Sequence, residues 1–323
     1  MAQVLRDKFD QAARSLETVI YGKTQVIKNI FISILAGGHC LIEDLPGVGK
    51  TLLAKSFGKI FFPPETDIPI FKRIQFTPDL LPSDILGVNI FLNGQFKFVR
   101  GPIFTHLLLA DEINRAGPKV QSALLEAMAE KQVTIDNETY KLPEVFTVLA
   151  TQNPLDLAGT HPLPIAQLDR FLMRIPMYYA DPSTEEEILK SESTIQSNFE
   201  KLEPLLSLQD VLEARKLINS VFVCNPIVQA ILEIGILSRS ERGSFGLSTR
   251  ALILLKKACQ ARAFLEGRNY VSDEDLKALY IPILNHRLGL RSMQEAAGFL
   301  EMLTSNIFKH LPGLVLEELR SFQ

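Results

Sequence analysis

The 323-residue chain is long enough for two domains, and its formal net charge of −3, from 34 basic and 37 acidic residues, gives no global electrostatic attraction for nucleic acid. Its three cysteines lie far apart without a C-x-x-C pair, which favours neither a disulfide framework nor a zinc site and fits a reducing cytoplasm. No stretch of about 18 uncharged apolar residues occurs, so we expect no membrane insertion, a cytoplasmic location, and partners that are proteins or small molecules.

Short apolar runs alternate with helical patterns in the first half of the chain. This alternation predicts repeated strand-helix units, and hence an α/β domain built on a parallel sheet. The expected strands are residues 40–43, 71–76, 107–111, 145–151 and 171–177. Residues 118–130 carry apolar side chains at helical spacing after a proline that suits a first turn, so we expect a helix packed on the sheet there.

A glycine-rich loop follows the first expected strand. Gly47 and Gly49 precede a helix that begins near Lys50, which provides close backbone approach, a helix N-terminus and a lysine for the outer phosphates of a nucleotide. The full G-x-x-x-x-G-K-[ST] pattern would need glycine at position 44, where the chain has Asp44, but the P-G-x-G-K-T run is intact. The predicted nucleotide-binding residues of the loop are Gly47, Val48, Gly49, Lys50, Thr51 and Leu52.

Two adjacent acids stand where the expected strand at 107–111 ends. Asp111 and Thr51 are expected to hold Mg²⁺ and to contribute to nucleotide binding, while Glu112 is expected to polarise the attacking water. A solvated turn would explain an isolated acid pair equally well, but it explains poorly a pair that follows a phosphate-binding loop. No N-K-x-D guanine-reading motif occurs, so we expect ATP and Mg²⁺ as cofactors.

The expected strand at 145–151 leads into a polar segment that contains Asn153. Ligands of open α/β sheets bind at the carboxyl ends of the strands. We therefore expect Asn153 to orient the lytic water between Glu112 and the γ-phosphate. An ordinary turn formed by Asn153 and Pro154 is the alternative.

The chain changes character after residue 181, where no further strand-like alternation is found and helices are expected. Ser183 with Glu186 predicts a capping box at the start of one helix, and Ser272 with Asp275 predicts the start of another. A further helix is expected to bury one face that carries Leu252, Leu255, Cys259 and Ala263. The predicted domains are residues 1–181 and residues 182–323.

Taken together, these motifs resemble a MoxR-type AAA+ ATPase, in a branch related to the magnesium chelatase ATPase subunits. The segments that carry the resemblance, besides the loop and the acid pair, are residues 151–154, 168–171 and 246–250. The resemblance implies a P-loop NTPase αβα sandwich with a parallel sheet, followed by a smaller all-helical lid domain. It also implies a homo-oligomeric ring, usually hexameric, with ATP bound between neighbours.

The resemblance also assigns roles to residues outside the loop. Arg170 matches the arginine finger that reaches into the adjacent subunit's site, and Arg250 matches the sensor 2 arginine of the lid. A guanidinium suits the charge that develops on a transferred phosphoryl group. An ion pair between Arg170 and Asp169, and a solvated first-turn position for Arg250, are the alternatives. Ile20 and Gly22 match the segment beside adenine, although a helix end capped by Gly22 explains them almost as well.

Two hairpins are expected near residues 87–98 and 133–141, and the first is an insertion typical of this branch. The resemblance implies an ATPase that drives chaperone-like remodelling or maturation of protein complexes, with partners that carry von Willebrand factor A domains. A metal-chelatase-type motor or a DNA translocase is one alternative, although the slightly acidic composition disfavours nucleic acid. A nucleotide-binding switch or scaffold with little turnover is another.

Overall fold

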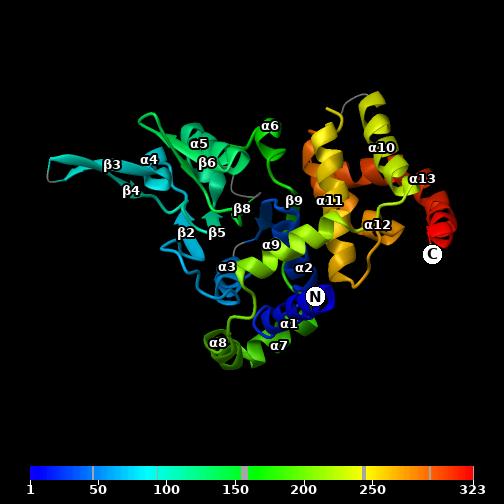
Figure 1. Ribbon diagram of the computed structural model, residues 1–323, viewed down its shortest axis with the longest axis horizontal. Coiled ribbons are helices and arrows are strands. Elements are labelled where there is room, and N and C mark those ends of the chain that lie inside the picture. Colours follow the sequence, from blue (N-terminus) through cyan, green and yellow to red (C-terminus); the bar gives the residue numbers. More distant parts are fainter. Residues whose placement is uncertain (46, 93, 154–158, 242–244, 291, 323) are drawn as a thin grey trace.

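A five-stranded parallel sheet, in the order β2-β5-β8-β1-β9, forms the centre of the first half of the molecule (Figure 1). The computed structural model describes residues 1–45, 47–92, 94–153, 159–241, 245–290 and 292–322. The strands of this sheet are β1 (Cys40–Asp44), β2 (Phe71–Gln75), β5 (Leu107–Asp111), β8 (Thr147–Gln152) and β9 (Met173–Met177). The predicted strands are therefore confirmed, with small shifts at their ends.

Helices cover both faces of the sheet, because successive side chains of a strand point to opposite faces. Leu107 and Leu109 of β5 join the core beneath α2 and α3, whereas Leu108 and Ala110 join the core beneath α5. The helices of this part are α1 (Ala2–Glu17), α2 (Thr24–Ala36), α3 (Lys50–Lys59), α4 (Pro82–Leu86), η1 (Ile113–Arg115), α5 (Pro118–Glu130) and α6 (Ile165–Leu168). The predicted αβα arrangement and the helix at 118–130 are confirmed.

Beyond residue 181 the described part of the chain is helical apart from single bridges such as Phe222 with Tyr270. The helices are α7 (Pro182–Lys190), α8 (Glu192–Glu200), α9 (Leu208–Asn219), α10 (Asn225–Ser240), α11 (Thr249–Leu265), α12 (Asp273–Leu284), η2 (Asn285–Arg287) and α13 (Met293–Phe322). Helices α9 and α11 pack against α2, so one hydrophobic core continues from the sheet into this part, and the domain boundary at residue 181 stays a prediction. Within the described residues, no helix has both the length and the apolarity needed to cross a membrane.

The start of α7 differs from the predicted capping box. Asp181 is the N-cap, and its side chain accepts a hydrogen bond from the backbone N–H of Thr184, while Pro182 is the first helical residue. The prediction that Ser183 and Glu186 form the box is therefore wrong by two residues. Aspartate is a strong N-cap, and proline suits the following position because it lacks only an N–H that would be unpaired there.

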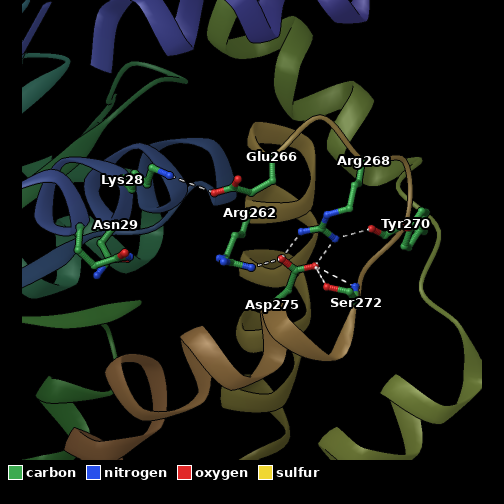
Figure 2. Close-up of polar contacts among 9 residues, drawn as sticks. Lys28, Asn29, Arg262, Glu266, Arg268, Tyr270, Ser272 and Asp275 are labelled. Atoms are coloured by element: carbon green, nitrogen blue, oxygen red, sulfur yellow. Dashed lines mark hydrogen bonds and ion pairs between the residues drawn. The ribbon is translucent and has the colours of Figure 1, made fainter. Parts of the chain in front are cut away.

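A buried aspartate organises the junction between α11 and α12 (Figure 2). Asp275 is 0% exposed and accepts hydrogen bonds from Arg262, from Arg268 at 2.6 Å and from the backbone of Ser272 at 2.8 Å. The predicted helix start at Ser272 is confirmed, and in the structure Ser272 and Asp275 form a capping box there. The predicted apolar face of α11 is also confirmed, since Leu252, Leu255, Cys259 and Ala263 are all buried.

Both predicted hairpins are present. The longer one, β3 (Gly87–Leu92) with β4 (Gln95–Arg100), extends away from the body of the molecule at the left of Figure 1. The shorter one is β6 (Gln132–Ile135) with β7 (Glu138–Lys141). The rings of Phe98 and Tyr140 stack with their centroids 4.1 Å apart, so the base of the longer hairpin is packed on the shorter one.

Candidate functional site

The glycine-rich loop lies between the end of β1 and the start of α3, as predicted. Gly47 and Gly49 have φ angles of 83° and 89°, in the left-handed region that favours glycine. Apart from their chain neighbours, no atom of the described residues lies within 4 Å of the position a Cβ would occupy on either glycine, so the loop presents an open backbone surface. Residue 44 is the last residue of β1, so the departure from the glycine pattern falls in the strand rather than in the turn. Pro46 lies outside the described residues.

Asp111, at the end of β5, is the centre of a buried polar cluster. Its carboxylate is 2% exposed and lies 3.4 Å from the Nζ atom of Lys50. The hydroxyl of Thr151 donates to Oδ1 at 2.7 Å, and the guanidinium of Arg73 donates to Oδ2 from Nη2 at 2.6 Å. Parallel pairing of β2, β5 and β8 brings these side chains to one edge of the sheet.

The carboxyl of Asp111 stays ionised in this cluster. Burial raises its pKa, but the hydrogen bonds from Arg73 and Thr151 and the charge of Lys50 outweigh burial, and the pKa is lowered overall. A carboxylate that remains charged inside the protein can bind a divalent cation once one of its cationic neighbours moves aside.

Glu112 adopts a left-handed backbone conformation, with φ of 57°, which is uncommon for a residue with a Cβ. Its backbone N–H donates to the hydroxyl of Thr151 at 2.9 Å. Its side chain accepts from Nε2 of Gln75 at 2.7 Å and lies 3.1 Å from Nε of Arg115. The strained turn thus points the carboxylate of Glu112 along the same sheet edge as Asp111, and β2 contacts both acids.

The donor set fits Mg²⁺ better than a metal held wholly by protein. Among the described residues there is no group of three or more His, Cys, Asp and Glu side chains that could hold an ion. Mg²⁺ is usually bound by one or two carboxylates and completed by phosphates and waters. Asp111, with Thr51 in the first turn of α3, supplies such a partial set.

A cavity of about 880 Å³ opens beside the glycine-rich loop. Gly47, Val48, Gly49 and Leu52 form one side of it, and Ile20 lies in the turn that forms another. The far wall comes from α7, α8 and the segment before them, with side chains that are mostly apolar: Tyr178, Tyr179, Ile188, Leu189 and Ile195. Four of the six predicted loop residues and Ile20 therefore meet at one cavity of a size that suits a small-molecule ligand, whereas Lys50 and Thr51 are not among its lining residues.

Gly22 does not line the cavity, but it helps to build the wall. Its φ is 67°, and a Cβ on it would lie 2.8 Å from Cγ2 of Thr184, so the glycine allows this turn to pack closely on α7. The alternative that Gly22 caps the first helix is wrong, because α1 ends at Glu17 with Thr18 as its C-cap.

Asn153 follows β8 directly and is partly buried. Because β8 pairs with both β1 and β5, Asn153 lies at the sheet edge that carries the loop and the acid pair. Its neighbour Gln152 donates to Glu43 of β1 at 2.5 Å, which links the two strands at this edge. Pro154, the second residue of the alternative turn, lies outside the described residues.

The two predicted catalytic arginines lie elsewhere. Arg170 precedes β9, and β9 runs parallel to β1, so Arg170 stands at the edge of the sheet opposite the glycine-rich loop. Asp169 pairs with Arg287 at 2.7 Å, and within the described residues no ion pair is formed by the side chain of Arg170. The alternative ion pair between Arg170 and Asp169 is therefore not found, because Asp169 pairs with Arg287 instead.

Arg250 is exposed in the first turn of α11. Burial lowers the pKa values of His39 and Arg287, and the positive charge of Arg250 lowers both further, which locates Arg250 near them. His39 precedes β1, at the end of the strand away from the loop. Arg250 and Arg170 thus share the side of the molecule that faces away from the cavity, and neither lines that cavity.

Sequence reasoning missed several residues that contact the acid pair or line the cavity. Arg73 and Gln75 alternate along β2, so both point toward the neighbouring acids, and Thr151 is the hydroxyl that links Asp111 to Glu112. The alternation of Arg73 and Gln75 around buried Ile74 was the available signal. No pattern in the sequence predicts that the apolar residues from Tyr178 onward line a cavity.

Comparison with family models agrees with this architecture. Residues 39–173 match the ATPase family associated with various cellular activities (AAA), and residues 238–303 match the AAA lid domain. The first match contains the loop, the acid pair and Arg170, and the second contains Arg250 and Arg287.

Similar proteins extend the match over most of the chain. The Bacillus subtilis protein YeaC is 41% identical over 87% of this chain and 86% of its own length. Chaperone MoxR1 of Mycobacterium tuberculosis is 36% identical over 87% of this chain and 75% of its own length. A crystal structure from Cytophaga hutchinsonii, provisionally assigned as an ATPase, has a TM-score of 0.83 and 39% identity, and the match covers 94% of this chain and 95% of that one. The chain has the AAA+ P-loop NTPase fold with a helical lid, and it belongs to the MoxR family of AAA ATPases.

Proposed function

We propose that this protein binds ATP with Mg²⁺ in the cavity beside the glycine-rich loop and hydrolyses it. The observation that carries the proposal is the contact of 3.4 Å between Lys50 and the buried carboxylate of Asp111, with Glu112 next in the chain and the cavity of about 880 Å³ alongside. The open backbone of Gly47 and Gly49 supports a phosphate site, because a side chain there would fill the space that the anion needs.

Each residue of the cluster has a role in this proposal. The loop amides and Lys50 bind the phosphates, and Lys50 turns from Asp111 toward them. Bound Mg²⁺ neutralises charge on the phosphate oxygens, and Thr51 and Asp111 would hold it. Glu112 accepts a proton from the attacking water, and Asn153 orients that water. Ile20 packs beside the base, with Gly22 setting the turn that carries it.

The site is completed by a second copy of the chain in a homo-oligomeric ring, most simply a hexamer. Arg170 precedes β9 at the sheet edge opposite the loop, and neither Arg170 nor Arg250 lines the cavity, so we expect both to act on ATP bound in another subunit. Both are available to a neighbour's site if subunits associate head to tail, as cyclic rings require. There they would stabilise charge on the transferred phosphoryl group.

The work done with ATP is chaperone-like remodelling or maturation of protein complexes in the cytoplasm. The relative MoxR1 carries the name chaperone, and the resemblance to MoxR proteins favours partners with von Willebrand factor A domains. The β3–β4 hairpin is the element best exposed to contact such a protein, since Phe91 and Phe96 on it are 64% and 76% exposed. The core domain at 1–181 would move against the lid at 182–323 during turnover.

Two variants separate an ATPase from a nucleotide-binding scaffold. Lys50→Ala should weaken ATP binding by on the order of tenfold or more, because a charge-assisted contact to phosphate is lost. Glu112→Gln should keep ATP binding and lower turnover by about 10²- to 10⁴-fold. Lys55→Ala, which removes an exposed lysine of the same helix, is the matched control and should change neither quantity. Binding is measured with a fluorescent ATP analogue and turnover by phosphate release.

Undiminished turnover in Glu112→Gln would contradict the catalytic role of Glu112. Binding of ATP by the wild type without measurable phosphate release would favour the scaffold. Stimulation of turnover by DNA, rather than by a protein client, would favour the DNA translocase.

A further inference from the structure

The segment that carries Arg170 is held from the lid. Residues 169–172 connect α6 to β9, and the η2 turn of the lid packs against them. Arg287, the last residue of η2, is 3% exposed and reaches this segment across 118 positions of sequence. Burying an arginine costs free energy unless its N–H donors are paired.

The guanidinium of Arg287 donates hydrogen bonds to the residues on both sides of Arg170. Before Arg170, Nε donates to the Asp169 carboxylate at 2.7 Å, and Nη2 donates to the Asp169 carbonyl at 3.3 Å. After it, Nη2 donates to the carbonyl of Phe171 at 2.5 Å, and Nη1 donates to the carbonyl of Leu172 at 3.3 Å. Nη1 also donates to Ile283 of α12, so the same side chain is fixed within the lid.

The surroundings of Arg287 and His286 keep each of these side chains in one protonation state at neutral pH. Burial lowers the pKa of Arg287 to about 10, and the Asp169 carboxylate offsets part of that effect, so the guanidinium stays protonated at neutral pH. Burial and the charge of Arg287 hold the pKa of His286 well below its ordinary value. Nε2 of His286 lies 2.7 Å from Nη1 of Arg287 and 3.2 Å from the carbonyl oxygen of Phe171.

We infer that Arg287 is a positioning residue for Arg170. It fixes residues 169–172, the finger segment, to the lid, so that the lid of one subunit determines the position of the Arg170 presented to its neighbour's ATP site. The inference rests on the proposed shared site. Arg170 itself is left out of the network, and its side chain is therefore available to project toward another subunit, while the backbone on either side of it is clamped.

The chemistry of the contact requires arginine. Only a planar fork of five N–H donors can reach a carboxylate and several carbonyls at once, and a lysine would supply the charge without the fork. Arg287→Lys should therefore keep the ion pair with Asp169 and release the carbonyls of Phe171 and Leu172. A displacement of about 1 Å at a catalytic group can cost on the order of 100-fold in rate.

The first measurement compares Arg287→Lys with a matched lid variant. Arg268→Lys makes the same change in a second arginine of the lid, the one that binds Asp275 in Figure 2. Within the described part of the chain, the side chain of Arg268 makes no hydrogen bond or ion pair to residues 169–172. Arg287→Lys should lower turnover by about 10- to 100-fold while ATP affinity stays within about twofold. Arg268→Lys should leave turnover per folded ring close to that of the wild type.

Mixed rings separate positioning from a general loss of structure. A chain with Arg287→Lys keeps an intact Glu112, and a chain with Glu112→Gln keeps an intact finger. In randomly mixed rings about a quarter of the interfaces join the two intact halves, so activity should return. Mixing Arg287→Lys with Arg170→Ala should restore nothing, because every interface then lacks a well-placed finger. The same pattern is expected for Asp169→Asn, which removes the anionic partner of Arg287 at a position that is 26% exposed.

The pair Arg170→Ala with Glu112→Gln is the control for the shared site itself. If that pair regains activity and neither Arg287→Lys nor Asp169→Asn does so with Glu112→Gln, the positioning role is wrong while the shared site stands. Wild-type turnover in Arg287→Lys alone would also overturn the inference. If the control pair regains nothing, the shared site fails and the role of Arg287 fails with it.

Discussion

The molecule contains two buried aspartates that look alike and differ in what they can do. Asp111 at the edge of the sheet is 2% exposed, and Asp275 in the lid is 0% exposed. Each has two basic neighbours and a hydroxyl donor: Lys50, Arg73 and Thr151 for the first, Arg262, Arg268 and Ser272 for the second. Both are therefore buried acidic side chains with cations beside them, as burial of such a group requires.

The difference lies in how exchangeable the partners are. The side chain of Arg73 is 42% exposed and can turn into solvent, and Lys50, 3.4 Å from Asp111, lies in the loop proposed to bind phosphate, so both cations have other partners available. Arg268 holds both oxygens of Asp275 at 2.6 Å, and the backbone of Ser272 adds a further donor at 2.8 Å. Asp111 can therefore accept a new ligand, whereas the hydrogen-bonding capacity of the Asp275 carboxylate is already used. A buried acid with arginines marks a functional site only when its partners can be displaced.

The largest effect should come from Asp111→Asn. The variant loses the charge expected to hold Mg²⁺, so turnover should fall by about 10²- to 10³-fold. Stability should change by less than about 1 kcal/mol, since Lys50 and Arg73 can be solvated. Phosphate release and chemical denaturation measure the two quantities. A large loss of stability with normal turnover would mean that Asp111 is structural, like its counterpart in the lid.

Asp275→Asn should give the reverse. It leaves Arg262 and Arg268 facing each other without a compensating charge, so the free energy of unfolding should fall by about 3 kcal/mol. Turnover per folded ring should stay near the wild-type value at temperatures below unfolding. Denaturation followed by circular dichroism, with phosphate release at a low temperature, tests this. A drop in turnover without a drop in stability would contradict a purely structural role for Asp275.

Much of this contrast could be foreseen for Asp111 and little of it for Asp275. The glycine loop and the apolar strand that ends in Asp111 and Glu112 are local patterns, and periodicity places both in the sheet. Ser272 with Asp275 was predicted only as a helix start, because the capping box is local. Its arginine partners come from α11 and from the following turn, and side-chain pairing of that kind is set by packing.

The contacts that span the fold could not be predicted. Arg287 reaches Asp169 across 118 residues, and Arg73 reaches Asp111 across 38 residues, through strand order and helix packing that the sequence does not spell out. In the sequence, residues 178–196 have only the pattern of ordinary amphipathic helices. Their role as a cavity wall depends on the packing of α7 and α8 beside the loop. Asp181 was overlooked as a cap because Ser183 offered the more familiar box pattern.

Lowering the pH should reduce the stability of the fold through His39 rather than change the ionisation of Asp111 at the nucleotide site. His39 is buried, accepts from the N–H of Val148 at 3.0 Å, and burial lowers its pKa to about 4. Between about pH 6.5 and pH 4 the unfolded chain binds a proton at this residue and the native chain does not, so stability falls as pH falls. The loss from His39 should be about 2 kcal/mol between pH 7.5 and pH 5.

His39→Gln is the variant that isolates this term, since glutamine does not titrate and can still accept a hydrogen bond. Urea unfolding at pH 7.5 and pH 5 should show a smaller difference for the variant than for the wild type. Asp111, whose pKa is lowered from its ordinary value, remains ionised over the whole interval. An unchanged pH dependence in the variant would show that acid acts through other groups.

The smallest effect is expected for Arg73→Met. Removing a partly exposed cation from Asp111 should free the carboxylate for Mg²⁺, and it should lower the Mg²⁺ concentration for half-maximal ATP binding by about fivefold, or about 1 kcal/mol. Titration of Mg²⁺ against a fluorescent ATP analogue measures this, with Arg268→Met in the lid as the matched control. A higher Mg²⁺ requirement in Arg73→Met would indicate that Arg73 helps to build the site rather than to occupy it.

The most direct test of the account is phosphate release by rings mixed from Arg170→Ala and Glu112→Gln chains. Neither variant alone should turn over ATP appreciably. Mixed rings should regain activity, because some interfaces then join an intact Asp111–Glu112 pair to an intact Arg170 of the neighbour. Mixed rings that stay as inactive as the separate variants, although both chains bind ATP and assemble, would contradict a site shared between subunits.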